Sequence, residues 1–211
     1  MFSHVSASRL RRWELALLLG LATVLLLGNF LEREQSDLAD SVLRLHVLAN
    51  SDTKADQELK LKVRDGVLAE ANAILPRQAD RAEAERILGE NLQRLAAAGA
   101  AVVAEEGYDY PVSACLQETW FPTKEYEDFA LPAGQYQALR IVIGEGDGQN
   151  WWCVVFPPLC LGSVSETSAQ TALDAGLSEQ QVALLTGESG GYVVKFKALE
   201  LWEQVKMAFQ R

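Results

Sequence analysis

The sequence predicts an α+β domain in which an antiparallel sheet packs against helices, preceded by one hydrophobic helix for export or anchoring. Three patterns support this fold class: one long apolar run near the N-terminus, helical periodicity in the first half, and strand-like runs in the second half. We divide the chain into residues 1–31, a signal peptide or signal anchor; residues 32–40, a spacer; and residues 41–211, a single extracytoplasmic domain.

The N-terminal segment has the features of an export element. Three arginines, Arg9, Arg11 and Arg12, precede an apolar stretch over residues 15–31 that only Gly, Thr and Asn interrupt. As a helix this stretch is about 26 Å long, at the low end for crossing a bilayer. Because no small-x-small cleavage site follows closely, we favour an uncleaved anchor over a cleaved signal peptide. Residues 32–211 are then expected outside the cytoplasm, where cysteines oxidise.

The first half of the exported part predicts one strand and two helices. Residues 41–49 alternate as a strand, with Arg44 and His46 on one face. Thr53 and Asp56 then approximate a capping box for a helix that reaches Leu75, before Pro76 ends it. A second helix begins near Asp80, with Gly99 as a weak point and Gly107 as its C-terminal cap.

The second half is predicted to be mostly β. Strands are expected at 111–121, 135–144 and 150–156. The Asp147-Gly148 pair between the last two favours positive φ, so it predicts a hairpin. Further along, we expect one or two short helices over 167–187, a strand over 192–196 and a terminal helix over 197–209.

The segment Trp-Trp-Cys-Val-Val-Phe-Pro-Pro-Leu-Cys, residues 151–160, is the most unusual in the chain. It predicts a buried strand that ends at Phe156, because the Pro157-Pro158 pair donates no ladder hydrogen bonds. Cys153 and Cys160 would lie roughly 23 Å apart in an extended chain, whereas a disulfide needs Cα atoms about 4.4 to 6.8 Å apart. They pair only if the prolines reverse the chain, with a cis bond as one route. Pairing of Cys115 with either one, or three reduced thiols, are the alternatives.

Charge and motifs exclude several function classes. The net charge of −10 disfavours nucleic acid and anionic lipid as partners. The chain has no nucleophile elbow, phosphate loop, metalloprotease motif or Cys-x-x-Cys pair, so we expect no catalytic, cofactor or metal site. The competing hypotheses are an exported hydrolase that uses His46 with a cysteine or Ser51, and an envelope-binding structural domain.

Three segments resemble the stage II sporulation protein R family of endospore-forming bacteria. They are residues 43–65, with Leu-Arg-Leu-His-Val-Leu-Ala-Asn-Ser-Asp; residues 131–143, Leu-Pro-Ala-Gly-Gln-Tyr-Gln-Ala-Leu-Arg-Ile-Val-Ile; and residues 148–160, which contain the Trp-Trp and Pro-Pro pairs. The resemblance extends over nearly all of residues 41–211.

The resemblance implies a signalling protein without a reaction of its own. Family members are exported from the forespore into the space between two membranes, where they cause a membrane aspartic protease of the mother cell to process pro-sigma-E. The family supplies no residue-level contacts. We expect the contact surface in the unusual segments at strand ends: Asn50, Ser51, Asp52, Trp151, Trp152, Pro157 and Pro158.

Overall fold

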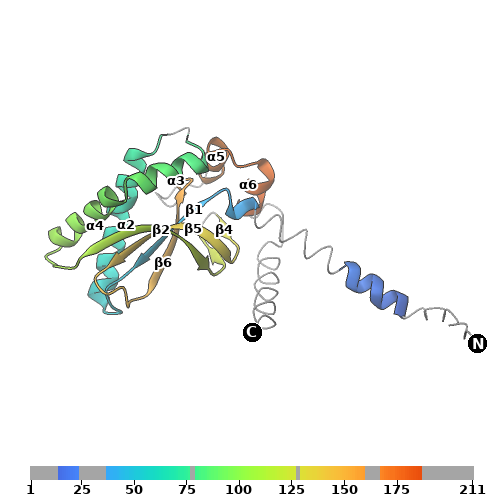
Figure 1. Cartoon of the computed structure of the whole chain (residues 1–211), viewed down its shortest axis with the longest axis horizontal. Helices are drawn as coiled ribbons and strands as arrows, with labels where there is room; N and C mark the ends of the chain where they lie inside the picture. The colour runs from blue at the N-terminus through green and yellow to red at the C-terminus, as the bar shows by residue number, and fades with distance from the viewer. Residues whose placement is uncertain (1–13, 24–36, 77–78, 127–128, 160–166, 187–211) are drawn as a thin grey trace, which may run out of the picture.

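The computed structural model describes residues 14–23, 37–76, 79–126, 129–159 and 167–186. A four-stranded sheet has the order β2-β5-β1-β6. Helices α2, α3 and α4 cover one face, while a two-stranded sheet and helices α5 and α6 lie beside the other (Figure 1). The element bounds are β1 Leu43–Leu48, α2 Lys54–Ile74, α3 Arg81–Glu90, α4 Leu92–Glu105, β2 Val112–Phe121, β3 Lys124–Glu125, β4 Ala130–Leu131, β5 Gly134–Ile143, β6 Asn150–Phe156, α5 Thr167–Asp174 and α6 Glu179–Thr186.

The α+β class is confirmed, but the sheet is mixed rather than wholly antiparallel. Strands β2 and β5 are antiparallel, as are β1 and β6, whereas β1 runs parallel to β5. Strand β1 is central and buried on both faces. Leu43, Leu45 and Val47 join the core under the helices, and Val42 joins a second core on the opposite face. The predicted alternation of this strand is therefore confirmed.

The predicted hairpin between β5 and β6 is wrong, because β1 lies between these strands. The connection over 144–149 crosses the end of β1 instead. Its backbone bonds to the turn that follows β1: Gly148 N donates to Ala49 O at 3.0 Å, and Glu145 N donates to Asn50 Oδ1 at 3.1 Å. The positive φ angles of the connection occur at Gly144 and Gly146 rather than at the predicted Asp147-Gly148 pair.

The helix layer follows the local sequence signals with one difference. Thr53 caps α2, since its Oγ1 accepts from Asp56 N at 3.3 Å. The second predicted helix is two helices, α3 and α4, with the break at Asn91 rather than at Gly99. A Cβ at Gly99 would lie 3.0 Å from the Val112 side chain, so this glycine lets α4 pack closely against β2.

The N-terminal expectations fall partly outside the described residues. Residues 14–23 form a helix whose five leucines are at least half exposed. Among the described helices, none combines the length and the apolar character needed to cross a membrane. The rest of the expected anchor, residues 24–31, lies outside the described part of the chain, as do the predicted strand over 192–196 and the helix over 197–209.

The crossover generates a stability prediction. Gly144 has φ +58°, and a Cβ there would overlap the Asn50 side chain; Gly107 has φ +80° but open space around it. Both Gly→Ala substitutions incur the left-handed strain, roughly 1–2 kcal/mol, but only Gly144→Ala also displaces Asn50. We expect Gly144→Ala to lower the free energy of unfolding by about 1–3 kcal/mol more than Gly107→Ala. Urea unfolding of the detergent-purified chain, followed by tryptophan fluorescence, measures both; equal losses would contradict the crossover geometry.

Candidate functional site

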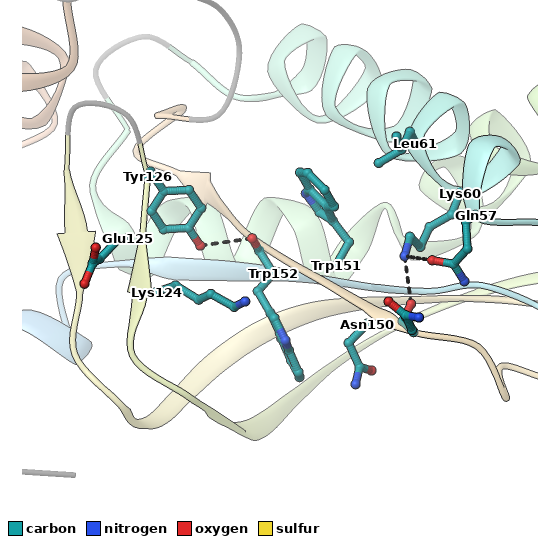
Figure 2. A pocket seen from close by; sticks show the side chains of 10 residues that line it. Gln57, Lys60, Leu61, Lys124, Glu125, Tyr126, Asn150, Trp151 and Trp152 are labelled. Atoms are coloured by element: carbon teal, nitrogen blue, oxygen red, sulfur yellow. Dashed lines mark hydrogen bonds between the residues drawn. The ribbon is translucent and has the colours of Figure 1, made fainter. Parts of the chain in front are cut away.

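A pocket of about 410 Å³ lies along the outer edge of β6 (Figure 2). Helix α2 forms one wall, the β3 segment forms the other, and the first residues of β6 lie between them. We call this the β6 edge pocket. Its lining residues are Gln57, Lys60, Leu61, Lys124, Glu125, Tyr126, Gln149, Asn150, Trp151 and Trp152.

The two tryptophans contribute to the pocket from opposite faces of the sheet. Trp151 lies on the side of α2, where the Arg64 guanidinium carbon is 4.6 Å from its ring centroid. Trp152 lies on the second face, stacked on the His46 ring at 4.0 Å between centroids. Phe121 packs edge-on against Trp152 at 4.6 Å. Both predicted contact residues therefore line one pocket, each held in place by a neighbouring ring or cation.

Lys60 is a buried cation at the α2 wall, only 4% exposed. Its Nζ donates to Gln57 Oε1 at 2.6 Å and to the Gln149 carbonyl at 2.8 Å. Both acceptors are neutral, and burial lowers the pKa of this amine below its ordinary value. The ammonium group has three N–H donors, so these two hydrogen bonds leave one donor unused.

Side chains cover two backbone carbonyls along this edge. Lys60 bonds the Gln149 carbonyl, and the Tyr126 hydroxyl donates to the Trp152 carbonyl at 3.0 Å. An edge strand with open backbone groups invites pairing with another strand. Covering these carbonyls opposes strand addition at this point.

Tyr126 is itself fixed by a buried arginine. Arg44 is 0% exposed, and its Nη2 donates to the Tyr126 hydroxyl at 3.0 Å. The guanidinium carbon lies 4.1 Å from the Phe121 ring centroid and 4.9 Å from that of Tyr136. Arg44 Nε also donates to the Cys153 carbonyl at 3.2 Å. The β3 wall of the pocket is thus tied to the central strand.

The turn after β1 has a role in the fold. Asn50 Nδ2 and Ser51 Oγ donate to the Asp56 carboxylate at 2.9 and 2.5 Å, and Asp52 Oδ1 accepts from Gln149 N at 2.7 Å. The bonds from Ser51 and Asn50 lower the pKa of Asp56. These contacts account for Asn50, Ser51 and Asp52 within the protein. Their contact with a partner stays a prediction.

Strand β6 contains a disulfide-bonded cysteine, and the predicted prolines follow its end. The Phe156–Pro157 peptide is cis, with Pro157 buried and Pro158 exposed. Cys153 is disulfide-bonded and Cys115 is a free cysteine, whereas Cys160 lies outside the described residues. Pairing of Cys153 with Cys160 therefore stays a prediction.

Peptide mapping checks this pairing. Tryptic digestion of the non-reduced full chain should release one peptide that contains both Cys153 and Cys160 and reacts with a thiol reagent only after reduction, whereas Cys115 should react without reduction. Mass spectrometry before and after reduction identifies both products. A linked pair that contains Cys115 would show that the prediction is wrong.

His46 is a packed residue of the second sheet face. It is 6% exposed, and its Nε2 lies 2.7 Å from Asn150 Oδ1, so Nε2–H is the donor. A hydrolase would need a nucleophile within hydrogen-bond reach of the ring. Cys115 is on β2. Two strand spacings, about 9.6 Å in total, separate β2 from β1. Cys153 joins the core under the helices and is already disulfide-bonded.

Ser51, the other candidate nucleophile, donates to Asp56 rather than to the histidine. The described residues therefore contain no nucleophile–imidazole pair at His46. No group of three metal-ligating side chains occurs among them either.

The environment of His46 predicts a pH dependence. Burial lowers its pKa below the ordinary 6.5, nearby Arg140 adds to this, and the Asn150 bond opposes it. Below pH 6.5 the unfolded chain takes up a proton before the folded chain does, so the free energy of unfolding falls as pH falls. His46→Gln should remove this slope between pH 7.5 and 5. Urea unfolding across this range measures it, and an unchanged slope would contradict the assignment to His46.

Sequence reasoning missed Lys60, Lys124 and Tyr126 as pocket residues. A signal for Lys60 was present, because it lies on α2 beside the apolar Leu59 and Val63 and one turn after Asp56. Lys124 and Tyr126 belong to a loop-like segment without a strong pattern. Only the tertiary structure brings that segment to β6.

Comparison with known proteins identifies the family. The model of the family "Stage II sporulation protein R" matches residues 39–166. The stage II sporulation protein R of Bacillus subtilis (strain 168) is 38% identical over 138 residues, which is 65% of this chain and 62% of that protein. The chain therefore covers less than two thirds of this relative's length. No solved structure matches. The match to more than half of the chain shows that it belongs to the stage II sporulation protein R family.

Proposed function

We propose that this protein is an exported sporulation signal that activates a membrane-embedded aspartic protease, which then processes pro-sigma-E in the mother cell. Membership of the stage II sporulation protein R family carries this proposal. In this role the chain acts by binding and performs no reaction. It is exported from the forespore into the intermembrane space and held there by residues 15–31.

Two observations support an extracytoplasmic location. The exposed leucines of residues 14–23 form an apolar helical surface without a protein core to cover it in the described residues. Such a surface is suited to lipid. Cys153 is disulfide-bonded, a state that persists in oxidising compartments.

The β6 edge pocket supports a binding role. It combines two tryptophans and a tyrosine with several polar groups, the residue types common at interface hot spots. Trp151 and Trp152 are fixed by Arg64 and His46 in the free protein. A surface ordered in advance loses little conformational entropy when it binds. We therefore place the contact with the protease at this pocket.

Activation then follows from differential affinity. A ligand shifts a receptor between two states only as far as it binds one state more tightly than the other. A shift from 1:99 to 99:1 requires roughly a 10⁴-fold preference. The domain would stabilise the active assembly of the protease by binding its extracytoplasmic part in that state.

Co-expression in a non-sporulating host tests the proposal. The full chain, the matching membrane protease and pro-sigma-E are produced together, and immunoblotting follows the size of the precursor. We expect processing with the wild-type chain. Leu18→Arg with Leu21→Arg should abolish it, because each arginine opposes membrane insertion by about 2.5–3.5 kcal/mol.

Leu173→Arg is the matched control for this export variant. Leu173 is a 38% exposed leucine on α5, so its substitution leaves the N-terminal helix intact and should preserve processing. Absence of processing with the wild-type chain, when all three proteins are folded and correctly located, would contradict the proposed function. It would favour the hydrolase and envelope-binding hypotheses.

A further inference from the structure

The basic side chains of the protein fall into two groups. Among the described residues, six form ion pairs with carboxylates: Lys54, Lys62, Arg64, Arg81, Arg86 and Arg94. The other four described lysines and arginines form none, although the chain has a net charge of −10. These four are Arg44, Lys60, Lys124 and Arg140.

Two of these four cations lie at the edge of β6, one on α2 and one on β3. Lys60 and Lys124 both line the β6 edge pocket. Figure 2 shows them on opposite sides of the Trp151–Trp152 pair, with Lys124 extended toward Trp152. Glu125 is the one carboxylate of the lining, and it is exposed and turned away from both tryptophans. Among the described residues, neither ammonium group forms an ion pair, although the Asp52 carboxylate lies near enough to oppose the lowering of the Lys60 pKa.

Two further donors are left over at the same place. Lys60 is 4% exposed and has only neutral acceptors, Gln57 and the Gln149 carbonyl, for two of its three N–H groups. The buried indole Nε1 of Trp151 has no hydrogen-bond partner in the described part of the chain. Buried donors without acceptors are rare in native structures, and each one calls for a specific explanation. An anionic acceptor that a partner brings into the pocket would bond the third N–H of Lys60.

We propose that the β6 edge pocket receives an extended acidic segment of the partner protein, whose carboxylates pair with Lys60 and Lys124 while its chain packs on Trp151 and Trp152. This inference rests on the proposed function, because it names the chemistry by which the partner is recognised. Charge complementarity selects this occupant, since an unpaired cation surface in an acidic protein repels basic partners and attracts acidic ones. The covered carbonyls of Gln149 and Trp152 favour side-chain recognition over strand addition.

Selection from a peptide library tests the inference without the protease. Random heptapeptides displayed on phage are selected on the detergent-purified full chain, and the enriched peptides are sequenced. We expect Asp and Glu to be enriched at fixed positions. Lys124→Gln should remove this enrichment, because it deletes one cation and leaves the Lys60 hydrogen bonds intact.

Lys54→Gln is the matched control. Lys54 is also a lysine at the surface, with a 91% exposed side chain on α2 outside the pocket. A selected peptide, labelled for fluorescence anisotropy, should bind the Lys124→Gln chain about five- to tenfold more weakly than wild type. Its affinity for the Lys54→Gln chain should stay within about twofold.

Three outcomes would overturn the inference. The first is a selection without acidic enrichment on the wild-type chain. The second is displacement of the peptide by acetate or phosphate at equal concentration, which would indicate a site for small anions only. The third is self-association that Lys124→Gln abolishes in sedimentation, which would make a second copy of this chain the occupant. None of these results depends on the processing assay, so failure here and failure of the proposed function are distinguishable.

Discussion

The positive charge of Arg44 is buried in the middle of the sheet. It constrains the side chains that pack around it on the second face. A guanidinium stays protonated in proteins, so the fold must solvate it internally. No carboxylate does so among the described residues. Instead, Phe121 and Tyr136 present their rings, and Tyr126 and the Cys153 carbonyl accept hydrogen bonds from Nη2 and Nε, whereas the buried Nη1 has no partner among the described residues. Guanidinium is weakly hydrated and stacks well on aromatic faces, which makes arginine the suitable cation for this position.

The contacts of Arg44 help to determine the geometry of the pocket. Because Arg44 fixes Tyr126, the β3 segment lies against β6 and forms one wall of the pocket. The opposite wall, α2, is positioned by the Asn50–Asp56 turn, which also holds the crossover over 144–149. The turn after β1 and the lining of the pocket are therefore formed by different residues. The turn organises the fold, while Lys124 and the two tryptophans line the pocket and Lys60 is buried in its α2 wall.

Local sequence patterns predicted the helices and strands well. They predicted poorly which strands lie next to each other in the sheet. The alternation of β1, the capping of α2 by Thr53 and the end of β6 before Pro157 all depend on interactions within a few residues, so they could be read from the chain. The β5–β6 hairpin could not be judged in this way. Gly144 and Gly146 look the same in a hairpin and in a crossover, because the strand that lies between β5 and β6 comes from 90 residues earlier in the chain.

The difference between local patterns and tertiary contacts also explains which pocket residues could be predicted from the sequence. Trp151 and Trp152 are conspicuous by type, and strand alternation alone places them on opposite faces. Lys60 and Lys124 are ordinary residue types. That neither forms an ion pair with a described carboxylate is visible only in three dimensions. Asn50, Ser51 and Asp52 show the reverse case. They are unusual in sequence because a crossing loop and a helix start both bond to them.

His46 belongs both to the buried core and to the pocket. It lies on the buried central strand, yet its ring is the surface on which Trp152 stacks at the rim of the pocket. Its lowered pKa keeps the ring neutral at pH 7, so stacking does not place a third charge beside Arg44 and Arg140. A neutral ring, held by Asn150, stacks on the Trp152 indole and restricts its position. The residue considered as the base of a hydrolase thus supports the Trp152 indole at the rim of the pocket.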